Sequence, residues 1–162
     1  MLRRTRVSAL IAAAVILAAA GPAWGHASLD QTSVPRSSEA TLTVRAPVEP
    51  QEHSDEDPDL NQRYNVKVSV EIPKGFAAIG CEAKPGWECK VNPKAGKTPH
   101  HVAYTRTGGP NDAEDVFAFR VTTPGKTGEY KFDINQTYSE GDVVQWSGDK
   151  DSPTPASFVT VE

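Results

Sequence analysis

The stretch Val66-Lys67-Val68-Ser69-Val70-Glu71-Ile72 decides the fold class, because apolar and polar side chains alternate along its whole length. A period of two places the apolar side chains on one face and the polar ones on the other, as in a β-strand that covers a core on one side. After residue 25, no window has the apolar spacing of an amphipathic helix. The chain is therefore predicted to be all-β.

Shorter alternating segments extend this pattern along the chain. Turn signals such as Gly108-Gly109-Pro110 and Pro124-Gly125 separate them. Strands about every 8 to 12 residues with turns between them predict an antiparallel β-sandwich. The segments expected as strands are residues 41–45, 66–72, 101–106, 116–121, 129–134, 143–146 and 157–161.

The first 25 residues have the order of a secretory signal peptide. Three arginines precede an apolar run from Val7 to Ala20, and small residues lie one and three positions before His26. The run has roughly 14 residues, fewer than the about 20 that a membrane-spanning helix needs, so no stable membrane span is expected. We therefore divide the chain into a signal peptide, residues 1–25, and one domain, residues 26–162, exported to the periplasm or cell envelope. A cut after Ala27 has the same spacing and is the alternative.

The charge of the exported domain limits its partners. The whole chain has 17 basic and 21 acidic residues, and the signal peptide removes three arginines and no acid, which leaves 14 basic residues and a formal charge of −7. Nucleic acids and anionic membranes bind basic patches, so both are excluded as expected partners.

The two cysteines, Cys81 and Cys89, flank Pro85-Gly86. In an exported chain an even pair around a turn predicts a local disulfide that closes a hairpin-like loop. A thiolate metal site is the alternative, although such sites usually have C-x-x-C spacing or nearby histidines.

Cleavage after Gly25 would give His26 an unusual chemistry. A terminal histidine offers its α-amine and a ring nitrogen to one metal ion, and nitrogen donors completed by carboxylate or water oxygens suit Cu(II). The other histidines, His53, His100 and His101, are expected to be surface residues. Trp146 is either a core residue or a shield beside a site at the edge of the sandwich. No hydrolase, metalloprotease or nucleotide-binding motif is present, so no enzyme is expected.

With these residues considered, the sequence resembles the YcnI-like family (DUF1775) of exported bacterial copper-binding proteins. The segment Gln136-Thr137-Tyr138-Ser139-Glu140-Gly141, followed by Trp146, resembles the Q-T-Y-S-x-G-x-x-x-x-W segment of the family. Residues 85–87 resemble its P-G-W, residues 67–75 its K-V-x-V-x-I-P-x-G, and residues 45–49 its R-V-P-x-E. The resemblance extends over nearly all of residues 26–162.

The resemblance implies an immunoglobulin- or cupredoxin-like sandwich that holds Cu(II) in a mono-histidine brace. His26 corresponds to the terminal histidine, Glu49 most plausibly to the glutamate ligand, and Trp146 to a tryptophan beside the metal. Glu71 is the fallback carboxylate. The chain departs from the family after the R-V-P-x-E motif, where about 15 residues precede the next predicted strand.

The expected function is Cu(II) binding in copper homeostasis, as a chaperone, carrier or sensor. The expected partners are the copper ion and a copper transporter or other envelope copper protein, and the sequence leaves a homodimer open. Two alternatives remain. One is a copper-dependent oxidative enzyme, which would need a second histidine, His100 or His101, at the metal. The other is an exported interaction module without metal, which requires an exposed apolar patch.

Overall fold

The computed structural model describes residues 25–48, 63–92, 100–108 and 115–162, and all regular structure within these ranges is β. The strands are β1 (Ser28–Leu29), β2 (Ser33–Val34), β3 (Glu39–Ala46), β4 (Asn65–Ile72), β5 (Ala77–Cys81), β6 (Trp87–Asn92), β7 (His100–Arg106), β8 (Asp115–Thr122), β9 (Gly128–Phe132), β10 (Ile134–Tyr138), β11 (Val143–Trp146) and β12 (Ser157–Val161). The predicted all-β class is confirmed.

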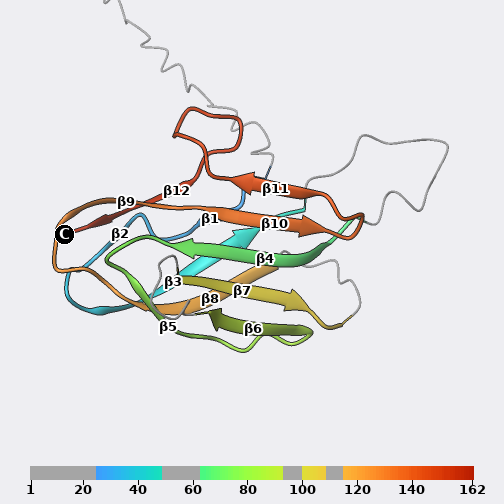
Figure 1. The fold of residues 1–162 in the computed structure, drawn as a ribbon, viewed down its shortest axis with the longest axis horizontal. Coiled ribbons are helices and arrows are strands. Elements are labelled where there is room, and N and C mark those ends of the chain that lie inside the picture. The colour runs from blue at the N-terminus through green and yellow to red at the C-terminus, as the bar shows by residue number, and fades with distance from the viewer. Residues whose placement is uncertain (1–24, 49–62, 93–99, 109–114) are drawn as a thin grey trace, which may run out of the picture.

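Two antiparallel sheets form the layers of the sandwich (Figure 1). One has the order β1-β3-β8-β5 and the other the order β11-β10-β4-β7-β6. Their inner faces meet through aromatic side chains, since the ring of Phe117 on β8 lies 4.5 Å from that of Tyr104 on β7 and 4.7 Å from that of Trp87 on β6. The alternating residues 66–72 belong to β4, which is the central strand of the five-stranded layer.

A third sheet, β2-β12-β9, lies at one end of the sandwich and contains a parallel pair, β2 with β12. Residues 128–138 pass from this sheet into the five-stranded one at Asp133, which separates β9 from β10. At that point the Asp133 carbonyl accepts a hydrogen bond from the backbone N–H of Glu71. The predicted strand 129–134 thus corresponds to β9 and ends at the first residue of β10, a strand of another sheet that was not predicted.

The core follows the inward positions of these strands. Leu42 and Val44 on β3, Val68 and Val70 on β4 and Phe119 on β8 are almost completely buried. Burying one such side chain contributes about 1.5–3 kcal/mol. Among the aromatic side chains of the strands, Tyr130 and Phe158 are half-buried, whereas the following are buried: Trp87, Tyr104, Phe117, Phe119, Phe132 and Trp146.

The predicted disulfide between Cys81 and Cys89 is present, but the hairpin around it is not. β5 pairs with β8 in the four-stranded sheet, whereas β6 pairs with β7 in the five-stranded sheet. The Pro85-Gly86 segment carries the chain from one layer to the other, so the disulfide joins the edges of the two sheets. The predicted disulfide is thus confirmed and only the expected hairpin is wrong, because β5 pairs with the distant strand β8 and β6 pairs with the following strand β7 rather than with β5.

Candidate metal centre

The start of the domain is fixed to the edge of the four-stranded sheet. β1 pairs with the end of β3, with Ser28 opposite Arg45 and Leu29 opposite Val44. Ala27 and Leu29 are buried, and the backbone N–H of Leu29 donates to Ser157 Oγ at 2.9 Å. These contacts leave His26 as an exposed residue directly before an anchored segment.

His26 packs against Trp146. The ring centroids lie 5.0 Å apart and the ring planes are inclined by 44°. The indole is 1% exposed, so Trp146 is at once a core residue and the surface against which the histidine lies. The two alternatives that the sequence left open for Trp146 are therefore compatible.

The backbone that leads toward Glu49 runs beside His26. Continuing the β1–β3 register by two residues places His26 opposite Pro47. Gly25 and Pro47 are in close contact, because a Cβ atom added at Gly25 would lie 2.2 Å from Pro47 Cγ. Glu49 and His53 lie outside the described residues. The structure therefore describes only the strand that precedes the predicted carboxylate ligand.

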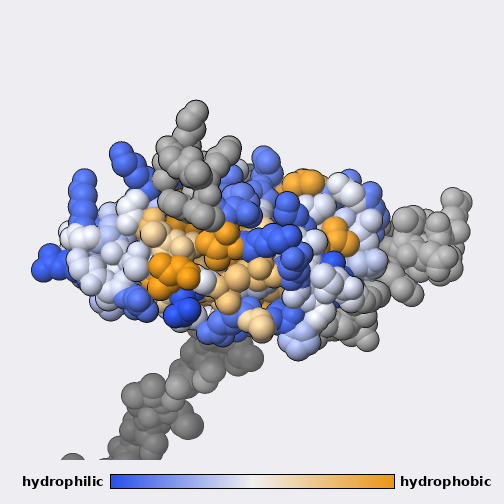
Figure 2. Space-filling view, turned by 60° about the horizontal axis from the view of Figure 1, so that its bottom comes forward, coloured by the Kyte–Doolittle hydropathy of each residue, from blue (hydrophilic) through white to orange (hydrophobic). Residues whose placement is uncertain are grey.

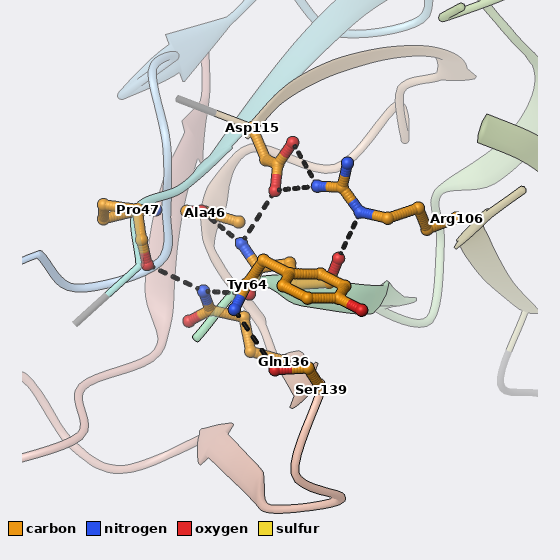
Figure 3. A network of polar contacts seen from close by, with 8 residues as sticks. Ala46, Pro47, Tyr64, Arg106, Asp115, Gln136 and Ser139 are labelled. Carbon is orange, nitrogen blue, oxygen red and sulfur yellow. Dashed lines mark hydrogen bonds and ion pairs between the residues drawn. The ribbon is translucent and has the colours of Figure 1, made fainter. Parts of the chain in front are cut away.

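A chain of buried polar contacts connects Trp146 to the opposite sheet, and Figure 3 shows the part of it that runs from Gln136 to Arg106. The indole Nε1 of Trp146 donates to Gln136 Oε1 at 2.6 Å, and Gln136 Nε2 donates to the carbonyl of Pro47 at 2.9 Å and to Asn65 Oδ1 at 3.1 Å. Asn65 Nδ2 donates to the carbonyl of Ala46 at 2.7 Å and to Asp115 Oδ2 at 3.1 Å. Satisfied buried networks of this kind rigidify a core.

An ion pair ends this chain of contacts. Arg106 Nη2 lies 3.0 Å from Asp115 Oδ2, and the side chains are only 5% and 2% exposed. Arg106 Nε also donates to the carbonyl of Asn65 at 2.6 Å. Burial raises the pKa of the Asp115 carboxyl, whereas the hydrogen bond from Asn65 and the charge of Arg106 oppose this rise.

The structure places the fallback carboxylate, Glu71, away from His26. Glu71 is exposed on β4, directly opposite His101 on β7. Its neighbour Val70 points inward in the same row as Ile134 and Trp146, so Glu71 projects from the outer face of the sheet. His101 Nε2 lies 3.1 Å from Asn92 Nδ2 on that outer face. Neither residue joins His26 and Trp146, and the side chain of His100 lies outside the described part.

Sequence reasoning gave no role to Gln136, Asn65 or the Arg106–Asp115 pair. Gln136 and Asn65 are both 0% exposed and occupy inward positions. A polar residue between inward Ile134 and Tyr138 would have identified Gln136 as a buried hydrogen-bonding group, had β10 been recognised as a strand.

Within the described ranges, no group of three or more His, Cys, Asp or Glu side chains is arranged to hold a metal ion. His26 nevertheless suits copper, because a terminal histidine would supply two of the nitrogen donors itself. No helix among the same residues is both long and apolar enough to span a membrane.

Comparison with known proteins gives the family. The profile described as Domain of unknown function (DUF1775) matches residues 26–161. The chain belongs to the DUF1775 family. The match begins at His26 and ends one residue before the end of the chain.

Two proteins are similar to this DUF1775 chain. The copper-binding protein CutI of Bacillus subtilis (strain 168) is 26% identical over 141 residues, which cover 86% of this chain and 64% of CutI. The chain thus spans less than two thirds of its curated relative. A crystal structure of an uncharacterized protein from Nocardia farcinica, described as having an immunoglobulin-like fold, aligns with a TM-score of 0.61 and 23% identity over 84% of this chain and 97% of that one. The predicted immunoglobulin-like sandwich is confirmed.

Apolar surface is exposed on the side of β5 and β6. Figure 2 shows it in the middle of that face, bordered by hydrophilic residues. Among the described large apolar side chains, Ile79 on β5 is 40% exposed and Val143 on β11 is 55% exposed. The apolar surface at β5 and β6 is what the interaction-module hypothesis requires. It lies at the opposite edges of the two sheets from β1 and β11, whereas Val143 shares β11 with Trp146.

Proposed function

We propose that this DUF1775 chain is an exported Cu(II)-binding protein of copper homeostasis, acting as a chaperone, carrier or sensor. Signal-peptide cleavage would make His26 the first residue, and its α-amine and ring nitrogen would hold the ion together with a carboxylate. The observation that carries the proposal is an exposed His26 packed on Trp146 immediately before an anchored strand. The similarity to a protein named for copper binding supports the choice of metal.

The geometry favours Glu49 over Glu71 as the carboxylate ligand. The β1–β3 register brings Pro47 beside His26, and Glu49 follows two residues later, within about 7 Å of extended chain. Glu71 belongs to the outer face of another sheet. Trp146 would act beside the metal by limiting the orientations of the imidazole ring.

This function requires no chemical reaction at the metal. An oxidative enzyme with two histidines at copper has no support from His101, which contacts Asn92 on the outer face. Cu(II) is therefore proposed as cargo, to be exchanged with a copper transporter or another copper protein of the envelope. A homodimer has no supporting observation among the described residues.

Copper titration of the mature protein tests the proposal. Protein that begins at His26 is titrated with Cu(II) against a competing chelator, and one copper per chain is expected. Loss of an outer-shell partner typically lowers metal affinity 10–100-fold. His26→Ala removes a direct ligand and is therefore expected to lower Cu(II) affinity at least about 100-fold. Glu49→Gln is expected to lower it at least about tenfold. Glu129→Gln, an exposed carboxylate on β9, is the control and should bind as the parent. Parental affinity in His26→Ala would refute the proposal.

A further inference from the structure

The buried side chain of Gln136 lies between the two parts of the proposed copper site. It points inward from β10 and contacts Trp146 on one side and Pro47 on the other. The contact to Trp146 holds the ring on which His26 packs. The contact to Pro47 holds the backbone that leads to Glu49. The amide group of Gln136 therefore contacts both Trp146 and Pro47, the two residues that support the proposed site.

Asn65 holds the neighbouring carbonyl in the same way. Its Nδ2 donates to Ala46, directly before Pro47, while its Oδ1 accepts a hydrogen bond from Gln136. Two consecutive carbonyls at the end of β3 are thus each bound by a side-chain amide from the five-stranded sheet. This fixes the path of the chain where it leaves the four-stranded sheet.

The partners also determine how both amides are oriented. Asn65 Nδ2 faces a carbonyl and a carboxylate, which only accept, so Asn65 Oδ1 must face Gln136. Gln136 must then present Nε2 to Asn65 and Pro47, which leaves Oε1 for the indole N–H of Trp146. Each hydrogen of both amide groups has an acceptor, and glutamine at position 136 supplies an acceptor and two donors at the required places.

We propose that Gln136 is a positioning residue of the copper site. It fixes Trp146, on which His26 packs, relative to Pro47, which lies opposite His26, and thereby holds the surroundings of His26 in one arrangement. This inference rests on the proposed function. Outer-shell groups that orient metal ligands typically change metal affinity 10–100-fold when mutated.

The test uses Gln136→Glu, which keeps the shape of the side chain and an acceptor for Trp146 but removes the amide donor to Pro47. In the mature protein, Cu(II) affinity is expected to fall about 10-fold or more. The electron paramagnetic resonance spectrum at full copper loading is expected to change, because Trp146 and Pro47, which lie beside His26, are no longer held together. Asn135→Asp makes the same chemical change one residue earlier, on the outer face of β10, and should leave affinity and spectrum as in the parent.

Gln136→Met is the second variant, for the case in which a buried carboxyl prevents folding. It removes all three hydrogen bonds of the Gln136 amide with a neutral side chain of similar length. In the metal-free protein, the Nε1–H of Trp146 should exchange with solvent faster in Gln136→Met than in the parent, and Cu(II) binding should weaken as in Gln136→Glu.

Two results would overturn the positioning role. One is parental affinity with an unchanged spectrum in a folded Gln136 variant. The other is a loss of affinity explained entirely by the unfolded fraction, again with an unchanged spectrum at full loading, since a purely structural residue would behave in this way. His26→Ala separates the two proposals. If it loses copper while the Gln136 variants do not, only the positioning role is wrong, whereas parental affinity in His26→Ala removes the copper site itself.

Discussion

The end of the sandwich around His26 and the outer face around Glu71 present similar residues in different settings. Each has a histidine, and each has a carboxylate on a neighbouring strand or directly after it. At the first, His26 packs on Trp146, which is held by Gln136 and a buried network. At the second, Glu71 and His101 face each other on the outer face of the five-stranded sheet, with Asn92 as the described partner of His101.

The difference shows that residue type alone does not define a metal site. A side chain supported by a rigid, buried network keeps its donor atoms in one arrangement, whereas exposed side chains must lose conformational freedom when they bind. His26 also gains a second nitrogen donor if cleavage frees its amine. His101, inside a strand, has only its ring.

The largest expected effect concerns the stability of the two regions. Arg106→Met removes the partner of a buried carboxylate, Asp115, and is expected to lower the free energy of unfolding by about 3–5 kcal/mol. Glu71→Gln changes an exposed side chain and should cost less than about 0.5 kcal/mol. Urea denaturation of both variants measures the contrast. Equal costs would mean that the buried network does not stabilise the end of the sandwich.

Acidification is expected to weaken copper binding at His26, because protons compete with copper for two nitrogen atoms, the α-amine and the ring nitrogen. Because copper must displace the protons of both nitrogen atoms, lowering the pH from 7.5 to 5.5 should reduce Cu(II) affinity. Acetylating the N-terminus leaves only the ring to take up a proton, so the same change in pH should reduce the affinity by a smaller factor. Titrations at several pH values measure the slopes, and identical slopes before and after acetylation would show that the amine is not a ligand.

The smallest expected effect belongs to the outer face. Glu71→Gln and His101→Ala should each change Cu(II) affinity less than about twofold, because neither side chain lies with His26 and Trp146. The same competitive titration measures both. A loss comparable to that of His26→Ala would move the site to the outer face and reverse the comparison.

The sequence predicted the fold class because strands with one buried face must alternate, and residues 66–72 do so without interruption. It did not predict β5 and β6 as strands, because neither has the clean alternation of residues 66–72: β5 has no fully buried residue and β6 has only Trp87. It did not predict β10 either, because the expected strand ended at Ile134, the first residue of β10. The disulfide was predicted from spacing, but its position between two layers depends on the pairing of β5 with the distant strand β8.

For the candidate site, the sequence indicated His26 and Trp146 but not what supports them. Gln136 was recognised only as part of a family motif, and Asn65 was not considered. Both are polar residues at inward positions, where the alternating pattern predicts apolar side chains. Their roles became apparent only from the hydrogen-bond partners that the fold brings together. Glu49 stays a prediction, because it lies outside the described residues.

The most direct test of the central claim compares two proteins that differ by one residue. One begins at His26 and the other retains Gly25 before it, which converts the α-amine of His26 into a peptide nitrogen. Cu(II) affinity is expected to be at least about 100-fold weaker in the longer protein, because this protein loses one direct ligand. Equal affinity in both would contradict a copper site built on the freed N-terminus.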